Sequence, residues 1–60
     1  MSQFEIRKST NGQYYWVFQA NNNEVICQSE TYVSKDSAKN SIQVVKTQAP
    51  AASINDRSGY

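Results

Sequence analysis

The sequence predicts an α+β fold with a three-stranded antiparallel meander, one helix and a short C-terminal strand, in the order β-β-β-α-β. Apolar and polar residues alternate over much of residues 4–30, as in half-buried strands, and polar turn residues interrupt the alternation twice. An apolar stripe with helical spacing follows over residues 38–49. A three-stranded sheet with one helix on one face makes a two-layer unit. We therefore expect one domain over residues 1–56 and a flexible tail at 57–60.

Two registers are open to the first hairpin, which joins strands predicted at 4–9 and 13–20 through a Thr-Asn-Gly loop. A two-residue Asn-Gly turn would place Arg7 on the same face as Trp16. A three-residue loop instead pairs Ile6 with Trp16 and gathers the large apolar residues on one face. Because a slip of one residue inverts every side chain, we favour the three-residue loop, with its glycine in the left-handed region.

The third predicted strand covers residues 24–30 and follows three consecutive asparagines, which tolerate positive φ better than other non-glycine residues. A two-residue Asn22-Asn23 turn gives three pairs, namely Ala20 with Val25, Phe18 with Cys27, and Trp16 with Ser29. The other register would point two polar side chains of this strand into the core. In the favoured register Cys27 is a small, inert core residue, because a reactive thiol needs exposure and a cationic neighbour.

The predicted helix begins after Ser34, whose side chain caps the first turn, and Asp36 suits the positive end of the helix dipole. Its apolar stripe consists of Ala38, Ile42, Val45 and Ala49. Pro50 ends the helix, and residues 52–56 form the last strand, anchored by Ile54. Three lysines of the helix are expected on a solvated face: Lys35, Lys39 and Lys46.

Composition excludes several kinds of site. The chain has 60 residues, a net charge of +1, no histidine and one cysteine. We therefore expect no metal site of Cys and His ligands, no His-based catalytic dyad, no intrachain disulfide and no cofactor. No apolar run is long enough to span a membrane, the N-terminus lacks the features of a signal peptide, and a lone thiol fits the cytoplasm. The apolar residues include no leucine, so the core of one copy is small.

The acidic residues do not point to catalysis. Glu30, Asp36 and Asp56 are the candidates for acid–base chemistry, but nothing in their spacing brings two of them together. Gly12 stands alone, so the chain has no Gly-rich phosphate loop. We therefore expect no enzymatic activity and assign no catalytic residue.

The outer face of the sheet, opposite the helix, is the candidate binding surface. Arg7, Tyr15, Val17 and Ile26 fall on this face, and the last three are expected to form a modest apolar patch for a ligand or partner. Trp16 belongs to the core, which leaves Tyr15 as the outward aromatic residue of its strand. A nucleic acid bound to this face is the alternative function, and its phosphate contacts would depend on Arg7.

Taken together, these residues resemble the YegP-like family of small bacterial domains of unknown function. The resemblance runs from Phe4 to about Asp56. It is carried by the pattern Phe4-x-Ile6, Gly12-x-Tyr14-x-Trp16-x-Phe18-x-Ala20-x-Asn22, Ser29-Glu30-x-Tyr32-x-Ser34-Lys35, Ile42 and Val45-Lys46. Family members carry this unit twice or dimerise, so the resemblance implies a homodimer that shares one sheet and exchanges its C-terminal strands. The exchanged strand would consist of Ser53, Ile54, Asn55 and Asp56.

The resemblance brings no activity, cofactor or catalytic residue, and it agrees with the small core expected for one copy. The sequence therefore indicates a non-enzymatic interaction module whose partner is a second copy of the same chain. A nucleic acid is the less favoured partner, no membrane contact is expected, and no small-molecule ligand is identified.

Overall fold

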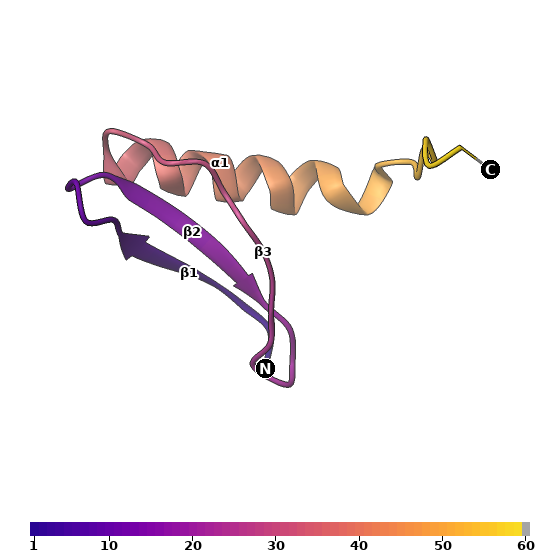
Figure 1. The fold of residues 1–60 in the computed structure, drawn as a ribbon, viewed down its shortest axis with the longest axis horizontal. Helices are drawn as coiled ribbons and strands as arrows, with labels where there is room; N and C mark the ends of the chain where they lie inside the picture. Colours follow the sequence, from indigo (N-terminus) through magenta and orange to yellow (C-terminus); the bar gives the residue numbers. More distant parts are fainter. Residues whose placement is uncertain (60) are drawn as a thin grey trace.

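The computed structural model describes residues 1–59 as a three-stranded antiparallel sheet with one helix packed on one face (Figure 1). The elements follow in the order β1 (Gln3–Lys8), β2 (Tyr14–Gln19), β3 (Val25–Gln28), α1 (Lys35–Gln48) and the 3₁₀ turn η1 (Ala49–Ala51). The strands lie in the order β1-β2-β3. This arrangement confirms the predicted α+β class, the meander and the single helix. Within residues 1–59 no helix is long and apolar enough to cross a membrane.

The first hairpin has the predicted three-residue loop. The Ser9 N–H donates to the Gln13 carbonyl at 2.7 Å, and the Gly12 N–H donates to the Ser9 carbonyl at 3.0 Å. Gly12 has a φ of 84°, the left-handed conformation that glycine adopts without a steric penalty. The loop sets the register that pairs Ile6 with Trp16, so the large side chains of β1 and β2 share one face as predicted.

Replacing Gly12 with Ala is expected to lower the free energy of unfolding by about 1–2 kcal/mol, because a Cβ atom is disfavoured in the left-handed region. No atom lies within 4 Å of the added Cβ, so the whole loss comes from the backbone. Urea unfolding followed by Trp16 fluorescence measures it. Gly59→Ala is the matched control, since Gly59 also has a positive φ but lies outside the sheet and the helix. Equal losses in the two variants would contradict this account.

The predicted two-residue turn of the second hairpin is wrong. The loop contains three residues, because the Ala20 N–H donates to the Glu24 carbonyl at 2.8 Å and the Asn23 N–H donates to the Ala20 carbonyl at 2.9 Å. Asn23 has a φ of 66° and takes the place that Gly12 has in the first loop. Both hairpins therefore use the same turn, and Ala20 does not pair with Val25 as predicted.

A β-bulge at Ile26 restores the predicted register further along β3. Val25 pairs with Gln19, but Cys27 pairs with Phe18, so Ile26 is one extra residue in β3. The predicted Phe18–Cys27 pair is thus confirmed. The predicted contact between Trp16 and Ser29 also holds, because the Ser29 N–H donates to the Trp16 carbonyl at 2.9 Å.

The core lies between β2 and the first half of α1. Trp16, Ala38 and Ile42 are buried, with half-buried side chains around them: Phe4, Ile6, Tyr14, Phe18, Tyr32 and Val45. The Trp16 indole N–H donates to the Ser41 Oγ at 2.7 Å, so the one polar group of this side chain is paired. The core is small, as the composition indicates.

The helix begins and ends as predicted. The Ser34 Oγ accepts a hydrogen bond from the Ser37 N–H at 3.1 Å, which caps the first turn. Asp36 lies in that turn, where the helix dipole favours a negative charge. At the other end α1 gives way to η1, which contains Pro50, because proline cannot donate the next helical hydrogen bond.

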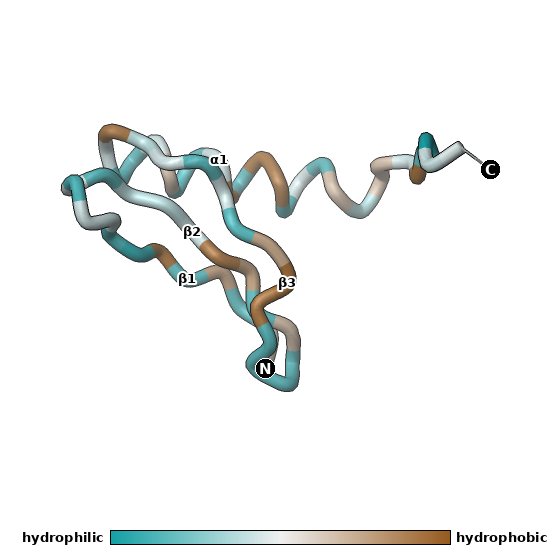
Figure 2. Tube along the Cα trace, in the orientation of Figure 1, coloured by the Kyte–Doolittle hydropathy of each residue, from teal (hydrophilic) through white to brown (hydrophobic). Residues whose placement is uncertain are grey.

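The C-terminal segment leaves the body of the molecule. The second half of α1 runs past the end of the sheet, and the chain continues in the same direction (Figure 1). Residues 52–56 form no strand within this single chain, and Ile54 is 97% exposed. Figure 2 shows one strongly hydrophobic position in this otherwise polar segment. The exchanged strand and the end of the domain at residue 56 remain predictions. Tyr60, the last residue of the predicted tail, lies outside the described residues.

Candidate interaction surfaces

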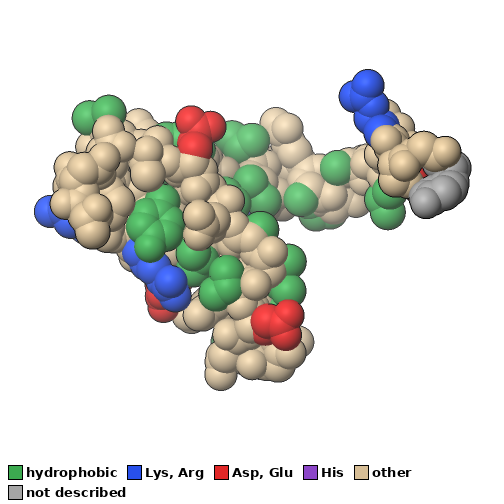
Figure 3. All heavy atoms as spheres, in the orientation of Figure 1, with side chains coloured by type: hydrophobic (Ala, Val, Ile, Leu, Met, Phe, Trp, Pro, Cys, Tyr) green, Lys and Arg blue, Asp and Glu red, His purple; other side chains and the backbone are tan. Residues whose placement is uncertain are grey.

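An apolar groove opens between the sheet and the second half of α1. Its volume is about 420 Å³, and its walls come from all three strands and the end of the helix. All but one of the lining residues are apolar or carry sulfur, and the exception is a lysine. The lining residues are Phe4, Trp16, Phe18, Cys27, Val45, Lys46, Ala49 and Pro50. Figure 3 shows hydrophobic side chains in the angle between the sheet and the projecting half of α1. This end of the apolar face is therefore open, in contrast to the closed core beside it.

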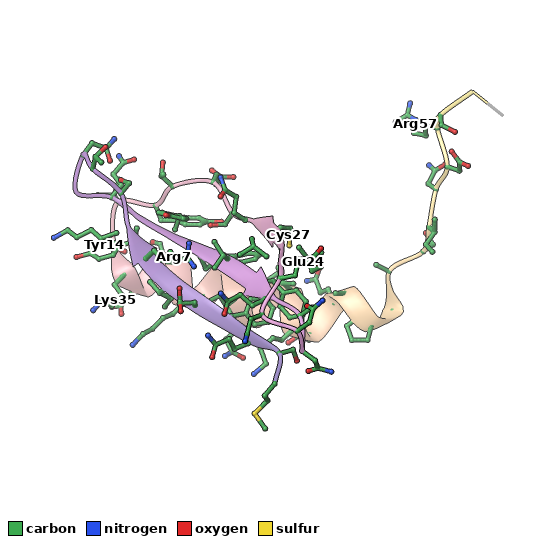
Figure 4. All side chains as sticks on the ribbon, turned by 60° about the horizontal axis from the view of Figure 1, so that its bottom comes forward. Arg7, Tyr14, Glu24, Cys27, Lys35 and Arg57 are labelled. Atoms are coloured by element: carbon green, nitrogen blue, oxygen red, sulfur yellow. The ribbon has the colours of Figure 1, made fainter. Side chains whose placement is uncertain are left out.

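Cys27 is exposed, which corrects its prediction as a core residue. The register was right, since Cys27 pairs with Phe18 on the helix side of the sheet. The reason for the difference is the position of α1, which packs on β2 and β1 and makes no close backbone contact with β3. The thiol consequently lies in the groove wall, at the end of the sheet where Figure 4 labels Cys27 and Glu24.

The outer face of the sheet carries the predicted residues, but the expected patch is wrong in one respect. Val17 pairs with Glu5 on β1 and with Gln28 on β3. It is only 1% exposed, because longer polar side chains stand around it. Ile26 is 59% exposed at the bulge, so the accessible apolar surface on this side belongs to β3 and not to the middle of the sheet.

Polar side chains on the outer face bond mainly to one another. The Arg7 Nε donates to the Glu5 carboxylate at 2.6 Å, and both side chains are 41% exposed. This contact raises the pKa of the Arg7 guanidinium above its usual value. The Gln3 side-chain amide donates to Gln19 at 2.8 Å. The predicted binding residue Arg7 is therefore already paired with a carboxylate.

The acidic candidates come from three different segments of the chain. Glu30 is in the loop before α1, Asp36 is in the first helical turn, and Asp56 is in the C-terminal segment. Two hydrogen bonds from Ser58, at 2.6 and 2.9 Å, lower the pKa of Asp56. Within residues 1–59, no group of three Cys, Asp or Glu side chains is placed to hold a metal ion.

Sequence reasoning missed a group of side chains at the opposite end of the sheet. The Lys8 and Lys35 Nζ atoms lie 5.7 and 5.9 Å from the centroid of the Tyr14 ring. The pairing of Lys8 with Tyr14 is implicit in the predicted register of the first hairpin. The approach of Lys35 is not implicit, because it depends on where α1 crosses the sheet.

Comparisons with known proteins agree on one family. Residues 9–56 match the model of a domain of unknown function, DUF1508. The chain is 43% identical over 53 residues to the UPF0339 protein YegP of Yersinia pestis, covering 88% of this chain and 47% of that protein. It is 34% identical over 53 residues to the UPF0339 protein NMB1088 of Neisseria meningitidis serogroup B, covering 88% of this chain and 95% of that protein.

The fold has also been seen in a solved structure. The solution NMR structure of a protein from Haloferax volcanii superposes with a TM-score of 0.83 at 30% sequence identity, covering 92% of this chain and 93% of that one. The lengths of the relatives differ. The chain spans about half the length of YegP of Yersinia pestis and nearly the whole of NMB1088. One unit of this size therefore occurs in proteins of two lengths.

Proposed function

This chain belongs to the DUF1508 family, and on that basis we propose that it is a non-enzymatic interaction module that works as a homodimer in the cytoplasm. The observation that carries the proposal is the open apolar groove beside the core. A chain of this size is only marginally stable, so covering an open part of its apolar face would add to its stability. A second copy of the chain is the simplest partner, because it is present wherever the protein itself is present.

The groove and the C-terminal segment have complementary properties. The groove is lined by aromatic and aliphatic side chains and has no cover. Ile54 has an aliphatic side chain that is almost fully exposed, on a segment that extends away from its own core. Burying an isoleucine stabilises by roughly 1.5–3 kcal/mol. If two copies exchanged these segments, the Ile54 side chain of each copy would enter the groove of the other. The two contacts would be identical, as two-fold symmetry requires.

The sheet offers an edge for the exchanged segment. Within the described chain, β1 pairs with β2 alone, so the backbone groups along its other side are free to pair. β1 has six residues in regular register, and its Phe4 reaches into the groove. Residues 52–56 could therefore add to β1 as a strand while Ile54 packs beside Phe4.

We assign no catalytic role, because the three acidic candidates come from different segments of the chain and Arg7 is already paired with Glu5. The cytoplasm is proposed because a lone thiol such as Cys27 stays reduced there. No nucleic-acid role is proposed, because the cation of the outer face is engaged by Glu5. A turnover that one point substitution abolishes would contradict the non-enzymatic part of this proposal.

The homodimer is tested by the solution mass of the purified protein. Light scattering on a dilution series is expected to give twice the chain mass of 6.8 kDa at high concentration, falling toward 6.8 kDa on dilution if the dissociation constant lies in the measured range. A mass of 6.8 kDa at every concentration would contradict the homodimer. In that case the groove would have to be covered by a different protein and not by a second copy of this chain.

A further inference from the structure

A basic corner lies at the end of the molecule opposite the groove. It consists of Lys8, Tyr14 and Lys35, from the end of β1, the start of β2 and the start of α1. The two ammonium groups lie 5.7 and 5.9 Å from the centroid of the same Tyr14 ring. Figure 4 shows Tyr14 and Lys35 together at this end, far from Cys27. Three separate elements thus bring two like charges to one aromatic side chain.

The backbone holds the centre of the basic corner in place. The Tyr14 N–H donates to the Tyr32 carbonyl at 2.8 Å, and the Tyr32 N–H donates to the Tyr14 carbonyl at 2.6 Å. Tyr14 also pairs with Lys8 in the β1–β2 ladder. Lys35 follows the capping residue Ser34 and is the first residue of the helix. The positions from which both lysines start are therefore fixed by strands and helix, and not by a free loop.

The positive charges of the basic corner have no carboxylate partner among residues 1–59. The ion pair in this part of the chain joins Arg7 to Glu5 and leaves Lys8 and Lys35 without one. Asp36 follows Lys35, but successive helical residues point about 100° apart, so its side chain diverges from the one that reaches Tyr14. Lys39 lies one turn after Lys35 and adds a further positive charge on the same flank.

We propose that the basic corner binds the phosphate group of a small phosphate monoester. Two ammonium groups that lie 5.7 and 5.9 Å from the same ring centroid raise the local positive charge, and a bound anion would be attracted to both. A phosphate monoester carries close to two negative charges at neutral pH and three strong acceptor oxygens, which matches two lysines and the tyrosine hydroxyl in number. Lysine is a common phosphate ligand in proteins.

The site is independent of the homodimer proposal. The groove is lined from the second half of α1, whereas the basic corner uses the first residue of that helix. Covering the groove therefore leaves the basic corner accessible, and a strand added along β1 would pair with its backbone and not with the Lys8 side chain. A homodimer would carry two such sites, and a monomer would carry one.

The test is a titration of the full ¹⁵N-labelled chain at low ionic strength, followed by amide chemical shifts. The probes are inorganic phosphate and adenosine monophosphate, with sodium chloride at equal ionic strength as the reference. Saturable shifts are expected at the amides of Lys8, Tyr14 and Lys35 with both phosphates. Tighter binding of adenosine monophosphate would show that the nucleoside part adds to recognition, and equal binding would assign recognition to the phosphate alone.

Three variants decide the outcome. Lys8→Gln/Lys35→Gln is expected to weaken phosphate binding by at least about ten-fold, while Lys8→Arg/Lys35→Arg retains it. Arg57→Glu lowers the net charge by the same two units elsewhere and is expected to change binding by less than about two-fold. Equal weakening in the Gln variant and in Arg57→Glu, shifts that match those with chloride, or no shifts at all would overturn the proposal. Far-UV circular dichroism shows that each variant is folded.

Discussion

Replacing Trp16 with Ala is expected to lower the free energy of unfolding by about 3–5 kcal/mol, as for other large-to-small substitutions in cores. Trp16 fills the space between the sheet and Ala38 and Ile42. Its ring meets the Phe4 ring edge to face, with the centroids 5.2 Å apart. The substitution also leaves the Ser41 Oγ without its indole donor. Because a domain of this size has a total stability of only about 3–9 kcal/mol, much of the variant should be unfolded at room temperature.

The neighbouring residue provides the control for this result. Tyr15 is half-buried on the outer face and pairs with Arg7. Tyr15→Ala removes a ring of similar chemistry from the same strand but opens no cavity in the core, so its expected loss is about 1 kcal/mol or less. Urea unfolding curves monitored by circular dichroism compare the two variants without relying on tryptophan fluorescence. If Tyr15→Ala were the more damaging change, the assignment of the two sheet faces would be wrong.

Replacing Ile54 with Asp is expected to convert a dimer of twice 6.8 kDa into a monomer over the accessible concentration range. The proposed dimer would contain two exchanged segments, so the substitution would act twice. The loss of two buried isoleucines is worth roughly 3–6 kcal/mol, which corresponds to a weakening of the dimer by about a hundred-fold or more. Deletion of residues 52–60 should have the same effect. Light scattering at matched concentrations measures both variants.

Val33→Asp is the matched control for Ile54→Asp. Val33 is also a strongly exposed aliphatic residue, at 83%, but it lies in the loop before α1 and away from the groove. Its substitution should leave the mass unchanged. The Cys27 thiol supplies a second readout, because it lines the groove. Thiol-specific alkylation should be slow in the full chain and faster after the deletion. An unchanged mass and alkylation rate would contradict segment exchange.

Much of the fold follows from local sequence patterns. Alternation of apolar residues in β1 and β2 determined the register, because the competing register would have placed Arg7 beside Trp16. The Ser34 cap, the apolar stripe of α1 and the end of the helix at Pro50 are short-range features with known residue preferences. These elements were therefore predicted with nearly their observed bounds.

The candidate surfaces were less predictable, because they depend on how the elements pack. The second turn was missed because Asn23 can take the left-handed position of a three-residue loop as readily as that of a two-residue one. The exposure of Cys27 depends on the direction of α1 across the sheet, which no residue pattern specifies. The burial of Val17 depends on the reach of the polar side chains around it. The basic corner likewise arises only when α1 is placed.

The extra residue in β3 affects how many copies of the chain could join through their sheet edges. A bulge interrupts the even spacing of backbone donors and acceptors that an added strand needs, and β3 has only four residues. The sheet therefore has one edge fit for growth and one that resists it. In the proposed dimer, each β1 edge would be occupied by the exchanged segment of the other copy. Only the two irregular β3 edges would stay open, and they are poor sites for adding another strand. The bulge at Ile26 would thus prevent a further copy from adding at the β3 edge, which favours a closed dimer over an open filament.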